Sequence, residues 1–273
     1  MTRQTDISIA TSFQYQMPLD RQIPCVAQAG FSSVSLGGRV GHSGYPDRAA
    51  RRRIKSQLAE CSLGVASLHA PPLDGADAAR DVRTAIEAAA DFGARFVVAH
   101  AGPFACGSDD VDRRLDAVLA ACHALAPVLD GCGVRLAIEN VLPGPATELA
   151  RRALHRLDPA RFGLCYDSSH DQIDGPRPFD LIDEFAGRIF MVHLSDRIRP
   201  HVDHVIPGEG FIDWPEMCNA LRQAEYRGPV LMEVMMQHSR HQDTDAFLSA
   251  AYAAGLDTQN RMFGRPTSIP PVE

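Results

Sequence analysis

Eight short apolar runs alternate with alanine-rich amphipathic stretches along this chain, and the alternation constrains the fold more than any other feature. The runs are DISIA (6–10), SSVSL (32–36), VASLH (65–69), RFVVAH (95–100), VRLAIE (134–139), FGLCY (162–166), IFMVHL (189–194) and PVLMEV (229–234). The helical stretches are roughly 19–29, 46–61, 76–92, 109–129, 146–156, 179–186, 213–225 and 241–254. Strands that alternate with helices predict parallel βα units, and nearly continuous apolar strands are typical of a sheet covered on both faces.

We predict that these units close into a (β/α)8 TIM barrel, an α/β fold that 273 residues can build as a single domain. The domain would span 1–273, with a core of about 6–255 and a loosely ordered, proline-rich tail at 264–273. A doubly wound open sheet is the alternative, but the turn after the first run, SIATSFQYQMP, contains no glycine. Predicted helix boundaries are an N-cap at Asp213 and stops at Gly30, Gly64, Gly93 and Gly131.

Composition disfavours several classes of function. A net charge of −7 and a pI near 5.9 argue against a dedicated nucleic-acid binder, which needs clustered Lys and Arg. Lys55 is the only lysine, which excludes a P-loop, and its basic, helix-like surroundings disfavour a Schiff-base role. Seven cysteines without a C-x-x-C pair favour structural thiols in a reduced, cytoplasmic protein. The N-terminus lacks the apolar core of a signal peptide, and no apolar run approaches the ~20 residues that span a membrane.

The strand ends carry the residues that point to chemistry. In a barrel of this kind the active site forms at the carboxyl ends of the strands. Six successive strands end in ionisable side chains: His69, His100, Glu139 (followed by Asn140), Asp167 with His170 three residues later, His193 and Glu233. The loop after the seventh strand adds His201, Asp203, His204 and Glu209.

Each of these residues has a plain structural explanation when taken alone. A single histidine at a strand end is more often a hydrogen-bonded core residue, and Asp167 followed by two serines can be only a turn. Their coincidence changes the interpretation, because carboxylates and imidazoles that converge on a barrel mouth are costly without a cation. Oxygen and nitrogen ligands without thiolates suit Mn, Mg, Co or Zn. We therefore predict a divalent-metal site.

Seven segments together resemble the xylose isomerase-like TIM barrels, over roughly residues 6–255: SLHAP, VVAHAG, LAIEN, GLCYDSSH, VHLSD, HVIPGEGFIDW and LMEV. That superfamily includes sugar isomerases and epimerases and the endonuclease IV family. Resemblance to the ketose epimerases implies one divalent ion (Mn, Co, Mg or Zn) held by Glu139, Asp167, His193 and Glu233. It also implies substrate contacts from His170, three residues after the aspartate, and Arg199, six residues after the ligand histidine.

The endonuclease IV branch of the same superfamily uses an enlarged ring that binds two to three zinc ions. The added ligands here would be His69, His100, His170 and His204. That branch has an aspartate two residues before the last histidine, where this chain has Val202, with Asp203 next to it. This departure and the acidic pI weaken the trinuclear reading, although small-molecule members of the superfamily also keep the extra histidines.

We predict a metal-dependent sugar or sugar-phosphate isomerase or epimerase that transfers a proton through an enediolate. The ion would polarise the carbonyl, and Glu139 and Glu233 would act as catalytic acid and base on opposite faces of the substrate. A zinc-dependent phosphodiesterase of the endonuclease IV type and a metal-dependent dehydratase or lyase are the alternatives. The expected partner is a small sugar or sugar phosphate; the resemblance also allows a homodimer.

Loops carry the predictions about specificity. Arg197 and Arg199 follow the seventh strand, near where barrels often bind phosphate, so they indicate either a phosphorylated substrate or a solvated arginine pair. The loops expected to select the sugar are 37–48, 71–75, 102–109 and 171–178.

Overall fold

The strands of the computed structural model, which describes residues 7–173 and 175–264, close into one parallel barrel in the order β1 to β8. They are β1 (Ile7–Ala10), β2 (Ser33–Leu36), β3 (Gly64–His69), β4 (Phe96–His100), β5 (Arg135–Glu139), β6 (Phe162–Asp167), β7 (Ile189–Leu194) and β8 (Val230–Met232). Strand β1 pairs in parallel with both β2 and β8, which closes the sheet. The predicted (β/α)8 barrel is confirmed.

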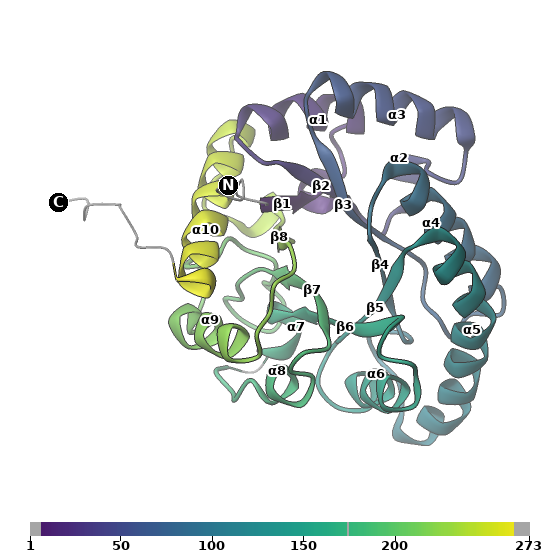
Figure 1. Cartoon of the computed structure of the whole chain (residues 1–273). Helices are drawn as coiled ribbons and strands as arrows, with labels where there is room; N and C mark the ends of the chain where they lie inside the picture. The colour runs from purple at the N-terminus through teal and green to yellow at the C-terminus, as the bar shows by residue number, and fades with distance from the viewer. Residues whose placement is uncertain (1–6, 174, 265–273) are drawn as a thin grey trace.

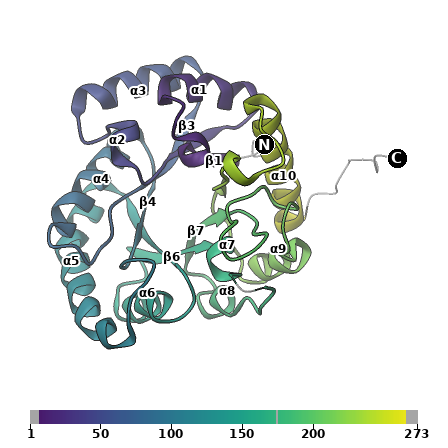
Figure 2. The ribbon, with the colours of Figure 1, turned by 180° about the vertical axis from the view of Figure 1, so that it is seen from behind.

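Helices surround the strands as a ring (Figure 1). The longer ones are α1 (Leu19–Gln28), α3 (Arg48–Glu60), α4 (Ala78–Phe92), α5 (Val111–Cys132), α6 (Pro145–Arg156), α9 (Trp214–Gln223) and α10 (Thr244–Phe263). Shorter helical segments are η1 (Thr11–Gln14), α2 (Val40–Ser43), η2 (Ser108–Asp110), α7 (Ser168–Asp171), α8 (Asp180–Glu184) and η3 (Met236–His238). Seen from behind, α7 lies inside the ring, next to β6 and β7 (Figure 2).

The predicted helix boundaries were partly wrong. Gly30 and Gly93 do follow helices with positive φ, and the Asp213 carboxylate caps α9 by accepting from the Glu216 N–H. Gly131 instead lies inside α5, which ends at Gly133 with φ 65°. Gly64 begins β3, and α10 runs nine residues past the predicted end, to Phe263. The proline-rich tail beyond Gly264 lies outside the described residues.

The segment Ser108–Cys132, which ends with helix α5, is long and apolar enough to cross a membrane by length and composition alone. This was not predicted, because charged residues near both ends of the helix, from Asp112 to Asp116 and at Asp130, interrupt the apolar run. In the barrel the apolar side of α5 is buried, and the helix contacts α4 and α6. Its length and composition are therefore explained by its place in the outer ring.

The geometry of the strands determines whether the side chain of each site residue points into the barrel. Successive side chains of a strand alternate between the barrel interior and the helices. A small interior cluster consists of Phe96, Val98, Ala137, Cys165, Phe190, Met191 and Leu231. Except for the adjacent pair Phe190 and Met191, the apolar chain neighbours of these residues belong to the larger core under the helices. A residue two positions after an interior one points inward again, one layer nearer the carboxyl ends of the strands. The predicted ligands occupy this upper layer.

Candidate metal-dependent active site

Five strands place ionisable side chains in the top interior layer. Each follows an interior residue by two positions: His100 follows Val98, Glu139 follows Ala137 and Asp167 follows Cys165, as His193 follows Met191 and Glu233 follows Leu231. His100 is in register with Glu139, and Asp167 with His193. The alternation of the strands therefore brings together residues that are far apart in the sequence, as predicted.

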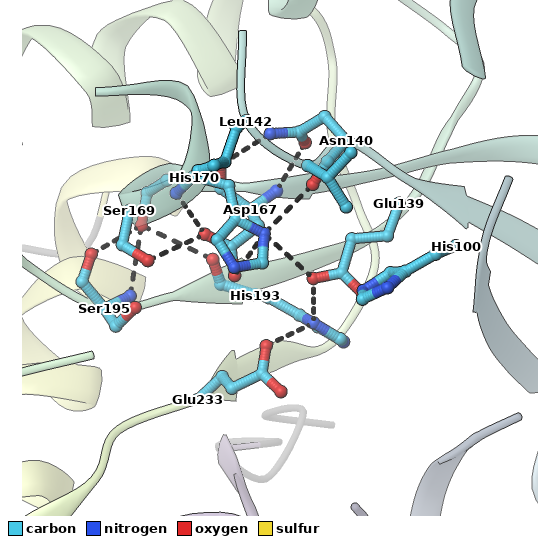
Figure 3. A network of polar contacts seen from close by, with 12 residues as sticks. His100, Glu139, Asn140, Leu142, Asp167, Ser169, His170, His193, Ser195 and Glu233 are labelled. Atoms are coloured by element: carbon cyan, nitrogen blue, oxygen red, sulfur yellow. Dashed lines mark hydrogen bonds and ion pairs between the residues drawn. The ribbon is translucent and has the colours of Figure 1, made fainter. Parts of the chain in front are cut away.

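Glu139 is the centre of the cluster (Figure 3). Its Oε1 lies 3.1 Å from His193 Nδ1, and its Oε2 lies 3.0 Å from His69 Nε2 and 3.3 Å from His100 Nε2. The side chain is 1% exposed. Oε1 therefore faces His193, whereas Oε2 faces His69 and His100. The carboxylate lies between these two sets of imidazoles and can contact both.

Glu233 approaches His193 from the side opposite Glu139. Its Oε2 lies 2.6 Å from His193 Nδ1. Among the residues that the structure describes, neither this oxygen nor the buried His193 Nε2 has a partner with hydrogen-bond geometry. One ligand atom from each of Glu139, Asp167, His193 and Glu233 lies within 4.8 Å of the other three. Ligands at about 2.0–2.4 Å from a common ion can be no more than about 4–5 Å apart. The four predicted ligands therefore fit a divalent ion.

The two carboxylate oxygens of Asp167 have different surroundings. Oδ1 accepts from the His170 N–H at 2.7 Å and from Ser169 Oγ at 3.0 Å, so it caps the short helix α7. Oδ2 is buried and has no hydrogen-bond partner among the described residues. An unsatisfied buried carboxylate oxygen is costly, so Oδ2 is the atom through which Asp167 would bind a cation.

Asn140 fixes the backbone of Asp167. Its Oδ1 accepts from the Asp167 N–H at 2.7 Å, and its Nδ2 donates to the Asp167 carbonyl at 2.9 Å. The sequence analysis named Asn140 only as the neighbour of Glu139. A buried asparagine at a strand end was the available signal, since such a group needs partners on the next strand.

His170 and His204 complete the wall of the site. His170 Nδ1 donates to the Asn140 carbonyl at 3.1 Å, which leaves Nε2 free for a substrate or an ion. His204 has a φ of 54° and lies with Nδ1 3.1 Å from the Glu233 carbonyl and from Ser195 Oγ. The two rings stack edge to face at 5.3 Å.

The charges of the cluster are strongly coupled. Burial would raise the pKa of Glu139, but the charge on His193 and hydrogen bonds from three imidazoles hold that pKa well below its ordinary value. Burial opposes the effect of His193 on Glu233 as well, whose pKa nevertheless falls to about 2. Burial lowers the pKa of His193, whereas Cys165, Glu233 and Glu139 together raise it well above its ordinary value. A proton on His193 thus offsets carboxylate charge, as a bound cation would.

Asp167 behaves differently from the two glutamates. Burial raises the pKa of its carboxyl, and the charges of His170 and His204 only partly oppose the rise. This carboxyl therefore has less compensation from its surroundings than Glu139 or Glu233 has.

A cavity of about 300 Å³ opens above the cluster. The site residues that line it are His69, His100, Glu139, His170, His204 and Glu233, and the rest of the wall comprises Ser12, Tyr15, Gly38, Ala70, Pro71, Pro72, Phe104 and Met235. This volume lies at the lower end of the range of about 300–1,000 Å³ found for small-molecule pockets. Four of the wall residues lie in the loops predicted to select the sugar, whereas Tyr15 was not anticipated.

The two arginines after β7 lie apart from the cavity lining. Arg199 is exposed, and the cavity lining does not include it. Arg197 is fully buried and donates to the Ser169 and Pro200 carbonyls and to Asp203, so it holds the loop together. The alternative of a solvated arginine pair is therefore wrong for Arg197.

A model of the family described as xylose isomerase-like TIM barrel matches residues 24–253. Inosose dehydratase from Geobacillus kaustophilus is 22% identical over 246 residues, which cover 78% of this chain and 79% of the relative. Uncharacterized protein y4fM from Sinorhizobium fredii is 27% identical over 106 residues, and the match spans 38% of this chain and only 34% of that protein.

Solved structures share the fold at low identity. The chain superimposes with a TM-score of 0.72 and 16% identity on 3-keto-D-glucoside 4-epimerase YcjR from E. coli, covering 92% of this chain and 99% of that one. D-psicose 3-epimerase from Clostridium cellulolyticum H10, solved with D-tagatose, gives a TM-score of 0.72 at 15% identity, covering 94% and 99%. An AP endonuclease of family 2 from Brucella melitensis gives 0.69 at 19% identity, covering 90% and 97%.

Proposed function

Because the chain belongs to the xylose isomerase-like TIM barrel family, we propose that it is a divalent-metal-dependent isomerase or epimerase of a sugar or sugar phosphate. The observation that carries the proposal is the pair Glu139 and Glu233, whose carboxylates approach the same His193 nitrogen at 3.1 and 2.6 Å and both line the small cavity. Two carboxylates that flank one substrate position suit the removal and return of a proton.

Glu139, Asp167, His193 and Glu233 are the residues that would hold the ion. The chemistry supplied by a bound divalent ion is Lewis acidity, which polarises a substrate carbonyl and acidifies the adjacent C–H. Asn140 keeps Asp167 in place, and the bridging position of Glu139 keeps its carboxylate between the two groups of imidazoles. These contacts pre-organise the site before substrate enters.

The proton transfer is assigned to the two glutamates. One carboxylate takes the proton from the carbon next to the carbonyl, which produces an enediolate, and the other returns a proton to the same or the adjacent carbon. Return to the same carbon gives an epimer. Return to the adjacent carbon gives the aldose–ketose isomer once a proton has also moved from the hydroxyl oxygen of the first carbon to the former carbonyl oxygen. His170, with Nε2 free, would bind a substrate hydroxyl or the developing oxyanion. The proposal includes action on a small molecule in the cytoplasm, which fits the seven free cysteines.

A dehydratase or lyase is the second candidate. The observation that favours it is the inosose dehydratase relative, which matches over most of both chains. That reaction would begin with the same proton removal and would end in loss of water. The mass of the product separates the two candidates, because an isomer keeps the mass of the substrate whereas dehydration lowers it by one water.

Solvent deuterium exchange tests the proposal. With Mn²⁺ present, a panel of ketoses and their phosphates is incubated in D2O, and deuterium at the carbon next to the carbonyl is measured by NMR. We expect exchange with at least one member of the panel and its loss in Glu139→Gln and in Glu233→Gln. Survival of exchange in both variants would refute the roles given to the glutamates.

The number of bound ions separates the isomerase from a zinc phosphodiesterase. His69 and His100 lie at Glu139 Oε2 and form, with this carboxylate, a second group that could hold an ion. Elemental analysis that finds about one ion per chain supports the isomerase. Two to three zinc ions, together with cleavage of a duplex that contains an abasic site, would support the hydrolase instead.

A further inference from the structure

Arg39 is a cation at the rim of the cavity. Its guanidinium carbon lies 4.5 Å from the centroid of the Tyr15 ring, and its backbone N–H donates to Tyr15 Oη at 3.3 Å. The side chain is exposed, and within the described ranges 7–173 and 175–264 no carboxylate forms an ion pair with it. A guanidinium positioned by an aromatic face and left without an acidic partner is able to bind an anion from the ligand.

Arg39 does not itself line the cavity, but the ring under its guanidinium and the residue before it in the chain do. Tyr15 and Gly38 line the cavity, and a methyl group on Gly38 would lie only 3.5 Å from His69 Nδ1. His69 in turn contacts Glu139 at 3.0 Å. The residue that precedes Arg39 therefore lies one imidazole ring away from the metal-binding cluster.

No other described arginine has this combination of features. Arg199, like Arg39, is exposed and outside the cavity lining, but no aromatic ring of the described residues lies under its guanidinium. Arg197 is buried with three acceptors. Arg240, near the loop after β8, is already paired with the Glu209 carboxylate at 3.0 Å. The cluster itself is rich in carboxylates, so it would repel an anionic group of the substrate, whereas the Arg39 guanidinium would attract that group.

We propose that Arg39, held on Tyr15, binds an anionic group on the distal end of the substrate, so that the enzyme acts on an acidic sugar, either a sugar phosphate or a sugar acid. The proposal rests on the proposed function, because it takes the carbonyl end of the same molecule to lie over Glu139 and Glu233. A planar guanidinium can bind a phosphoryl group or a carboxylate with two parallel hydrogen bonds.

Matched ligands test the assignment. D-fructose, D-fructose 6-phosphate and D-fructuronate share one carbon chain and differ in the group at carbon 6. Binding of each to the Mn²⁺-loaded protein is measured by calorimetry. We expect the wild type to prefer at least one anionic ligand over fructose, with the phosphate and the carboxylate arms identifying the group, and Arg39→Gln to weaken that ligand by about 10–100-fold. Fructose binding should change little.

Further variants distinguish anion binding by Arg39 from a general effect of the protein's net charge. Tyr15→Leu should lose part of the preference because it removes the aromatic support, whereas Tyr15→Phe should keep it. Arg53→Gln, an equal charge change at an exposed position of α3, should have no effect. Arg39→Lys should show an intermediate preference for the anionic ligand, because a lysine ammonium cannot form the two parallel hydrogen bonds of a guanidinium.

Three outcomes would overturn the inference. They are equal binding of the three ligands by the wild type, an unchanged preference in Arg39→Gln, and loss of the preference in Arg199→Gln instead. Deuterium exchange with neutral ketoses in any of these cases would leave the proposed function standing. Conversely, an anion preference without exchange of any substrate would overturn the proposed function and keep the assignment of Arg39.

Discussion

At the scale of single residues, Asp167 caps α7 through Oδ1, and we propose that it binds the ion through Oδ2. Asp167→Asn keeps an oxygen that can cap α7 but replaces the unsatisfied Oδ2 with an amide. We expect the fold to survive and metal affinity to fall by at least about 10–100-fold, since the variant loses the carboxylate charge. Asp167→Ala removes the cap as well and should cost about 1 kcal/mol more in stability.

Calorimetric metal titration and thermal melting, run on both variants, provide the two measurements. Equal metal affinity in the wild type and Asp167→Asn would show that Asp167 is only a capping residue. Equal melting temperatures of the Asn and Ala variants would show that the cap contributes nothing.

Phe104 is a second residue with a specific role at the rim. It is 45% exposed, and its ring meets His100 and His170 edge to face at 4.9 and 5.1 Å. We expect Phe104→Ala to raise KM several-fold with a smaller change in kcat, because the ring closes the cavity without reaching the glutamates. Phe104→Leu should restore much of the affinity. A fall in kcat alone would contradict this role.

At the scale of elements, Gly163 in β6 decides how the floor of the barrel packs. A Cβ at this position would lie 2.5 Å from the Phe190 ring and 2.7 Å from the Arg188 carbonyl. Gly163→Ala should therefore destabilise the protein by about 1–3 kcal/mol, measured by urea unfolding, with little change in metal binding. Gly131→Ala is the matched control. Nothing lies within 4 Å of its added methyl group in α5, and it should stabilise by about 0.5–1 kcal/mol.

The same elements show what the sequence could predict. Strand ends were predictable because an apolar run identifies a buried strand and its last ionisable residue identifies the mouth of the barrel. Gly131 was misassigned because a glycine inside a helix and one at its end look alike when the contacts are unknown. Arg197 could not be placed, since its burial depends on carbonyls of Ser169 and Pro200 that come close only in the folded loop.

The rim of the site was harder to predict for a related reason. The directions of the Arg39 and Phe104 side chains could not be predicted, because loops have no periodicity from which direction can be inferred. Tyr15 follows a 3-10 turn and reaches the cavity through contacts with the next strand's loop. The cluster of side chains at the base of the barrel mouth was therefore predictable, whereas most of the residues at its rim were not.

At the scale of the whole molecule, we expect a bound ion to raise the free energy of unfolding of the closed barrel. The four ligands come from β5, β6, β7 and the residue after β8, so one ion would join half of the barrel. An ion present at 100 times its dissociation constant adds about 2.7 kcal/mol to the native state. Removal of the metal with EDTA should thus lower the melting temperature by about 5–10 °C, because each kcal/mol corresponds to about 2–4 °C for a chain of this size.

Differential scanning calorimetry of the chelated protein, with Mn²⁺, Co²⁺ or Zn²⁺ added back in turn, measures this effect. The shift should return with the preferred ion and should be absent in Glu139→Gln, which loses the carboxylate shared by both groups of imidazoles. Because this readout does not depend on turnover, it tests the site even before the substrate is known. An unchanged melting temperature in every condition, together with no bound ion, would mean that hydrogen bonds and the proton on His193 alone balance the cluster, and the metal-dependent mechanism would fail with it.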